Sequence, residues 1–167
     1  MEYVPWRRIA DWHCLSCGDC CKLYSVVINF QEWLKIVKSY GVEHTASGLN
    51  KLFLSRRSDG SCTFLGWSHG LYFCQLQHMK PRACQLWPFK VLPKPDFGYS
   101  NEALYLYGGN RVYVYADPMC TGLRFGHPSL EFSNFTLPEF VELAAGVRSH
   151  QVKTTSRLRL NASYLRI

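Results

Sequence analysis

Four cysteines fall within eight consecutive positions near the start of the chain, in the stretch WHCLSCGDCC. They are Cys14, Cys17, Cys20 and Cys21, and the other four of the eight cysteines are Cys62, Cys74, Cys84 and Cys120. Unrelated buried thiols seldom crowd in this way. A chain with this pattern must fold so that its cysteines converge on shared sites, and this requirement constrains the fold more than any other sequence feature.

The cysteines are expected to bind metal rather than to form disulfides. The N-terminal stretch MEYVPWRRIADWHC lacks the apolar region of a signal peptide. No apolar run approaches the ~18–20 residues of a membrane span. We therefore expect a cytoplasmic protein without a membrane segment, and disulfides are uncommon in the cytoplasm. A disulfide framework is the alternative, and eight structurally unrelated thiols are a weaker one.

The spacing of the first cysteines bears on the kind of metal site. Two thiolates spaced Cys-x-x-Cys can bind one metal ion from a tight turn. Three in succession, Cys14, Cys17 and Cys20, suit an iron–sulfur cubane, whereas structural zinc sites more often use two separated pairs. Successive side chains of an extended chain point to opposite sides, so Cys20 and Cys21 would serve different sites. The hypothesis is two neighbouring centres, or one centre plus a second thiol-rich site.

The order of the cysteine motifs resembles the YkgJ-type cysteine-cluster family, described as a zinc- or iron-chelating domain with a Cys-x2-Cys-x2-Cys-Cys signature. The matching stretches are CLSCGDCC, CTFL, CQLQHMKPRACQLWPF and a late CTG, from about Cys14 to Gly122. The sequence departs from the family at Lys80 and Gln85, where arginines are usual. The resemblance implies that all eight cysteines are metal ligands. A similar cluster accompanies flagellin lysine N-methylases, which suggests an accessory or methylation-linked role.

Size and periodicity predict a small α+β domain with short antiparallel strands or hairpins and two main helices around a cysteine-ligated metal centre. The 167 residues fit one domain, and 47% are hydrophobic. We expect a cysteine-cluster domain over residues 1–150 and a basic C-terminal strand or tail over 151–167.

The expected elements follow from local patterns. A β-branched stretch predicts a strand over 22–30, and helical spacing with an Asn29–Glu32 capping box predicts a helix over 29–41. Hairpins are predicted over 50–65, turning at Asp59–Gly60, and over 103–117. A second capping box, Thr136 with Glu139, predicts a helix over 136–150.

Net charge of +7 suggests an anionic partner, either nucleic acid or an acidic membrane surface, although a merely soluble basic protein is the alternative. After Glu142 the chain has no acidic residue. The basic residues of this stretch, which we expect to bind RNA or a ribosome, are Arg148, Lys153, Arg157, Arg159 and Arg166.

No catalytic residue is assigned, because the sequence has no P-loop, no Gly-x-Gly-x-x-Gly and no Gly-x-Ser-x-Gly elbow. His13, Asp11, Asp19 and Asp117 lie near cysteines and are candidates to support the ligands. Two functions remain. A [4Fe–4S] cluster would serve redox or accessory work with a partner enzyme, or zinc or a cluster would hold the fold of a non-catalytic RNA- or ribosome-binding protein.

Overall fold

The hairpin predicted around Gly108 and Gly109 forms the centre of a four-stranded antiparallel sheet. In the computed structural model, which describes residues 2–151, Asn110 of β10 pairs with Tyr107 of β9. Both glycines have positive φ, 55° and 79°, which suits a tight hairpin turn. The strands of the sheet are β1 (Val4–Pro5), β8 (Phe89–Leu92), β9 (Leu104–Tyr107) and β10 (Asn110–Ala116).

The helix α5 (Leu137–Ala145) packs on this sheet and builds the first core. Phe140 is fully buried there beside Phe89, with ring centroids 4.5 Å apart. A π-helical segment, η4 (Phe132–Thr136), precedes α5, so the predicted capping box at Thr136 is wrong. Thr136 is already helical and its side chain makes no cap bond. The Ser129 hydroxyl instead accepts the Phe132 N–H at 3.1 Å, because the helical backbone begins before Thr136.

The second core lies between α2 (Phe30–Tyr40) and a three-stranded sheet. The predicted Asn29–Glu32 capping box is confirmed, with both reciprocal hydrogen bonds at 2.9 Å. Ile36 of α2 is buried in one hydrophobic cluster with Leu54 and Phe64. The strands of this sheet are β3 (Val27–Ile28), β5 (Leu52–Leu54) and β4 (Thr45–Ser47).

Three predicted elements differ from the structure, and one is the helix predicted over 136–150, which ends at Ala145 because the next residue, Gly146, has left-handed backbone. The start of the predicted strand over 22–30 is helical, because Gly18 at φ 76° begins α1 (Asp19–Leu23). The hairpin predicted over 50–65 is reduced to one bridge, Arg56 opposite Cys62, around the Asp59–Gly60 turn. The strand β5 instead pairs with β3 and β4.

The other elements are short. They are η1 (Trp6–Arg8), β2 (Ile9–Trp12), η2 (Val42–His44), β6 (Leu65–Ser68), β7 (Leu71–Cys74), η3 (Gln77–Met79), α3 (Arg82–Leu86), α4 (Ser100–Ala103) and β11 (Leu123–Phe125).

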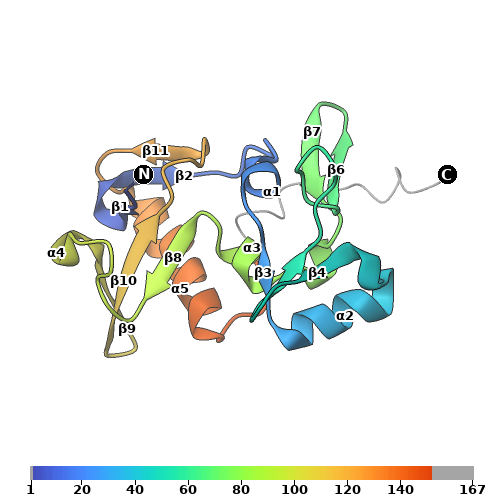
Figure 1. Cartoon of the computed structure of the whole chain (residues 1–167). Coiled ribbons are helices and arrows are strands. Elements are labelled where there is room, and N and C mark those ends of the chain that lie inside the picture. The colour runs from blue at the N-terminus through green and yellow to red at the C-terminus, as the bar shows by residue number, and fades with distance from the viewer. Residues whose placement is uncertain (1, 152–167) are drawn as a thin grey trace.

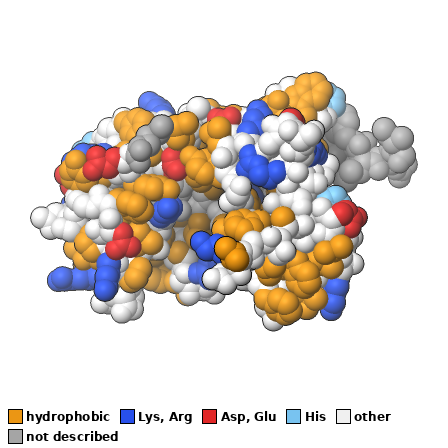
Figure 2. Space-filling model, in the orientation of Figure 1, with side chains coloured by type: hydrophobic (Ala, Val, Ile, Leu, Met, Phe, Trp, Pro, Cys, Tyr) orange, Lys and Arg blue, Asp and Glu red, His pale blue; other side chains and the backbone are white. Residues whose placement is uncertain are grey.

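The two cores meet at α1 and α3, which lie in the middle of the molecule (Figure 1). The helix α3 contacts α5 on the side of the first core and β3 on the side of the second. Hydrophobic side chains gather on the visible face over α2 (Figure 2). Phe30 of this helix is exposed and stacks on Trp33. The predicted tail beyond residue 151, with Lys153, Arg157, Arg159 and Arg166, lies outside the described residues.

Candidate metal centre

Two residues with left-handed backbone shape the loop that carries the first cysteines. Ser16 and Gly18 have φ of 53° and 76°, so the chain reverses between Cys14 and α1. A Cβ at Gly18 would lie 2.9 Å from Cγ of Tyr72, and the Tyr72 N–H donates to the Ser16 carbonyl at 2.9 Å. The loop therefore packs directly on the β6–β7 hairpin, whose last residue is Cys74.

The adjacent cysteines Cys20 and Cys21 lie in α1, with their Sγ atoms 3.8 Å apart. The expectation that an extended chain directs them to opposite sides is wrong, because successive helical side chains diverge by only about 100°. The two side chains still have different surroundings. Cys20 lines a cavity, whereas Cys21 packs against the second core.

Five thiols form one group at the junction of the cores: Cys20, Cys21, Cys62, Cys74 and Cys84. The Cys62 N–H donates to the Cys21 carbonyl at 2.8 Å. Burial raises the pKa of Cys84 well above its ordinary value, and the charges of Cys74, Cys20 and Cys62 raise it further. Since such influence falls with distance, these thiols are neighbours.

The other three cysteines, Cys14, Cys17 and Cys120, form a second group. Burial raises the pKa of Cys120, and the charges of Cys17 and Cys14 add to this effect. The Thr121 hydroxyl lies 3.5 Å from Cys17 Sγ and 3.4 Å from the Asp19 carboxylate. The segment before β11 is thus tied to the first cysteine loop.

Backbone N–H groups face three of the sulfurs, and each lies two residues after its cysteine. Such a hydrogen bond favours the thiolate and lowers the thiol pKa, although burial outweighs it here. Hydrogen bonds to sulfur are also among the features that tune iron–sulfur clusters. The donors are Phe64 to Cys62, Leu76 to Cys74 and Gly122 to Cys120.

Three further groups set the electrostatics of the thiols. The Trp12 indole N–H donates to Cys120 Sγ at 3.4 Å. The Lys80 ammonium lowers the pKa of thiols in the five-cysteine group, including Cys20, Cys74 and Cys84. A hydrogen bond from Cys21 is the largest influence on Cys20 and lowers its pKa to about 7, while the pKa of Cys21 is raised.

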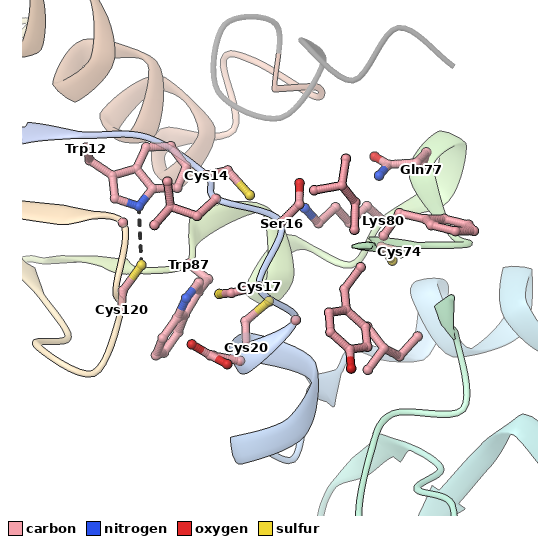
Figure 3. A pocket seen from close by; sticks show the side chains of 18 residues that line it. Trp12, Cys14, Ser16, Cys17, Cys20, Cys74, Gln77, Lys80, Trp87 and Cys120 are labelled. Carbon is pink, nitrogen blue, oxygen red and sulfur yellow. Dashed lines mark hydrogen bonds between the residues drawn. The ribbon is translucent and has the colours of Figure 1, made fainter. Parts of the chain in front are cut away.

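Two cysteines of the first group and all three of the second face one largely apolar cavity of about 330 Å³. Figure 3 shows Trp12 and Cys120 at one end and Cys74, Gln77 and Lys80 at the other, with Trp87 and the first cysteine loop between them. The cysteines in its wall are Cys14, Cys17, Cys20, Cys74 and Cys120.

The donor chemistry suits zinc or iron, because thiolates are the soft ligands that both bind in structural and cluster sites. Within residues 2–151, however, no three His, Cys, Asp or Glu side chains are close enough to hold one ion as they stand. The identity of the residues therefore fits a metal, while several sulfurs must move closer together to coordinate one.

The other predicted site residues have different contacts. His13 is exposed and binds the Asp11 carboxylate at 2.8 Å. Asp117 is buried and accepts bonds from Tyr24 and from the Met119 N–H. Arg148 pairs with Glu142 at 2.7 Å.

Sequence reasoning missed Trp12 and Thr121, because no local pattern links them to cysteines about a hundred residues away. Lys80 was identified only as a position where the family usually has arginine. Since both residues are cations, this position was a usable signal for a positive charge beside the thiols.

One comparison with known proteins gives a match. The model of the CxxCxxCC family, described as "Putative zinc- or iron-chelating domain", matches residues 13–121. No curated protein and no solved structure matches the chain. Among the described residues, no helix combines the length and the apolar character that crossing a membrane requires.

Proposed function

Because the chain belongs to the CxxCxxCC family of zinc- or iron-chelating domains, we propose that it holds an iron–sulfur cluster of the [4Fe–4S] type. The cluster would use Cys14, Cys17 and Cys20 together with Cys74 or Cys120. Its role would be redox or accessory work for a partner enzyme. When bound, the cluster would supply one-electron chemistry, and the chain's own residues would hold it and screen it from water.

The observation that carries this proposal is the cavity of about 330 Å³ with five cysteines in its wall. A single zinc ion enclosed by four sulfurs needs no such space, whereas a cubane with its sulfides does. The N–H groups that face Cys74 and Cys120 and the Lys80 ammonium are suited to a site that carries negative charge.

The three cysteines outside the cavity wall, Cys21, Cys62 and Cys84, would form a second thiol-rich site next to the first. Cys21 and Cys62 pack into the second core. In this proposal Cys20 and Cys21 serve different sites, as the sequence predicts. The reason differs, because the two residues lie in the helix α1 and not in an extended chain.

A structural zinc site is the second candidate, and the spacing of Cys20 and Cys21 favours it. Tetrahedral coordination with Zn–S bonds of about 2.3 Å holds two sulfurs about 3.8 Å apart. The two Sγ atoms are 3.8 Å apart. In this arrangement Cys20 and Cys21 would bind the same ion, and the metal would serve the fold alone.

The test is anaerobic purification of the full chain with analysis of iron, labile sulfide and zinc. We expect a coloured protein with iron and sulfide in equal amounts. A colourless protein with stoichiometric zinc and no iron would exclude the cluster and leave the structural zinc site.

Two matched variants then distinguish a cluster in the cavity from a zinc ion bound by Cys20 and Cys21. With a cluster in the cavity, Cys17→Ser loses most of the iron, and Cys21→Ser loses only part of the metal. With one zinc ion on Cys20 and Cys21, Cys21→Ser loses all of the metal and Cys17→Ser keeps it. Docking on RNA or a ribosome through the predicted basic residues stays a prediction, because four of the five lie outside the described residues and the fifth, Arg148, is paired with Glu142.

A further inference from the structure

A second cavity, of about 470 Å³, lies beside the thiol site and has a different character. Its wall holds four Lys or Arg side chains, two histidines and a single carboxylate, that of Glu32. It is formed by α2, the segment from η3 to α3, and the chain that follows α5. The basic residues in its wall are Lys35, His78, Lys80, Arg82, Arg148 and His150.

The carboxylates near this cavity are already engaged. One oxygen of Glu32 accepts the Asn29 N–H at 2.9 Å and the other accepts the Arg82 N–H at 2.7 Å. Glu32 thus fixes the starts of α2 and α3. Glu142 forms the ion pair with Arg148. Glu32 keeps its negative charge in the wall, but among residues 2–151 neither acid forms an ion pair with Lys35, Lys80 or Arg82, so the positive charges remain in excess.

Three cations therefore lack an ionic partner within the described chain. Between residues 2 and 151, no carboxylate forms an ion pair with Lys35, Lys80 or Arg82. The Lys80 ammonium donates to the neutral side-chain oxygen of Gln151 at 3.5 Å and also lines the thiol cavity, and the Arg82 guanidinium donates to the Ala144 carbonyl. Surplus positive charge around one concave site attracts an anion.

The end of α5 does not oppose an anion strongly, because three of its last four carbonyls are already bonded. Gly146 donates to the Leu143 carbonyl at 3.2 Å, Val147 donates to the Glu142 carbonyl at 3.0 Å, and Arg82 occupies the Ala144 carbonyl. The partial negative charge of a helix C-terminus resides mainly on such carbonyls when they are unsatisfied.

We propose that this cavity binds the phosphate group of an anionic ligand. Lysine ammonium groups and an arginine fork are the side chains that recognise phosphate in proteins. Pockets of about 300–1,000 Å³ accept small molecules, so the cavity has room for a phosphorylated compound of nucleotide size. The same chemistry would accept the phosphates of single-stranded RNA. The site shares Lys80 with the wall of the thiol cavity, but phosphate binding there needs no metal.

The experiment measures binding of inorganic pyrophosphate to the full chain by calorimetry at low ionic strength. The variants are Lys35→Glu and, as a matched control, Lys38→Glu. Both lysines are exposed on α2, but only Lys35 lines the cavity. We expect Lys35→Glu to weaken binding by about tenfold, because reversal replaces attraction by repulsion at short range, and Lys38→Glu to change it by less than about twofold.

The far-ultraviolet circular dichroism and the metal content of both variants should equal those of the unmodified protein. A second arm uses a single-stranded RNA oligonucleotide. If RNA competes with pyrophosphate and also loses affinity on Lys35→Glu, the site takes backbone phosphates; if it does not compete, the site takes a small phosphorylated molecule. Absence of pyrophosphate binding, or an equal loss in both variants, would overturn the proposal.

Discussion

At the scale of single residues, Trp12 links the first core to the thiol site. Its ring packs edge-on against Phe89 and Phe140, with centroids 5.9 and 5.2 Å away, and its indole N–H reaches Cys120. Trp12→Phe keeps an aromatic ring but removes the donor and some volume. We expect the free energy of unfolding in urea to fall by about 1–2 kcal/mol.

The matched control for this substitution is Trp67→Phe. Trp67 is exposed on β6, and this change should leave the unfolding free energy within about 0.5 kcal/mol. An equal effect of the two substitutions would mean that neither the bond to Cys120 nor the packing of Trp12 contributes measurably.

Tyr24 gives the molecule an alkaline dependence that can be tested. Its hydroxyl donates to Asp117 at 3.1 Å, and burial together with this bond raises the pKa of Tyr24 to about 12. An unfolded tyrosine titrates near 10. The folded state therefore holds the proton more tightly, so this stabilisation is complete below about pH 10 and is lost as the pH rises through 12.

We expect Tyr24→Phe to lower the free energy of unfolding by about 1 kcal/mol at pH 8, because Asp117 loses a donor. The difference from the unmodified protein should shrink between about pH 10 and 12. The hydroxyl of Tyr113 forms no hydrogen bond within residues 2–151, so Tyr113→Phe is the control. A difference for Tyr24→Phe that stays constant across this pH range would contradict the linkage.

At the scale of elements, the loop between Cys120 and β11 is held against the first cysteine loop by close backbone contact. The His13 N–H donates to the Gly122 carbonyl at 3.1 Å, and a Cβ on Gly122 would lie 2.0 Å from the His13 carbonyl oxygen. Gly122→Ala must therefore push the two loops apart. We expect a loss of about 2 kcal/mol or more in unfolding free energy and a fall in metal content.

Gly48→Ala is a suitable comparison for Gly122→Ala. Its added Cβ would meet the Phe53 ring at 3.1 Å, where a side chain can move, and no cysteine is among the residues that it would contact. Retained metal in Gly122→Ala would show that the spacing of the two loops does not control binding.

The elements also show what a sequence can predict. The start of α2 was predicted correctly because Asn29 and Glu32 satisfy each other's backbone within four residues. The Thr136 cap failed because the same signal lies inside a helical segment that Ser129 begins. The helix α1 was missed because its start depends on Gly18, whose conformation fits the packing of Tyr72 from a distant hairpin.

The candidate metal centre likewise has features that local sequence predicts and features that only tertiary contacts decide. The eight candidate ligands were identified from local spacing and from the family resemblance, but their grouping depends on tertiary contacts. The link between Thr121 and Cys17 joins positions 104 residues apart. The cavity that contains Lys35 and Arg82 has no local signature either, because its residues come from three separate segments.

At the scale of the whole molecule, the cysteines stand between two small cores. Cys120 packs against the first core, and Cys21, Cys62 and Cys74 pack against the second. The first core also has the four-stranded sheet and α5, whose buried residues, Val114 and Phe140 among them, include no cysteine. A bound metal would thus stabilise the junction more than the sheet.

Removal of the metal should therefore loosen the molecule unevenly. We expect hydrogen exchange after chelation to rise most in residues 13–18, in the β6–β7 hairpin and in residues 117–122, where the cysteine loops meet. Amides of β10 and α5 should keep most of their protection, because their hydrogen bonds and burial do not depend on the thiols.

The measurement is hydrogen exchange followed by mass spectrometry on metal-loaded, metal-stripped and reloaded protein. Reloading should restore protection at the junction. A uniform rise over both cores would mean that the metal supports the entire fold, and no change anywhere would mean that the thiols hold no structural metal.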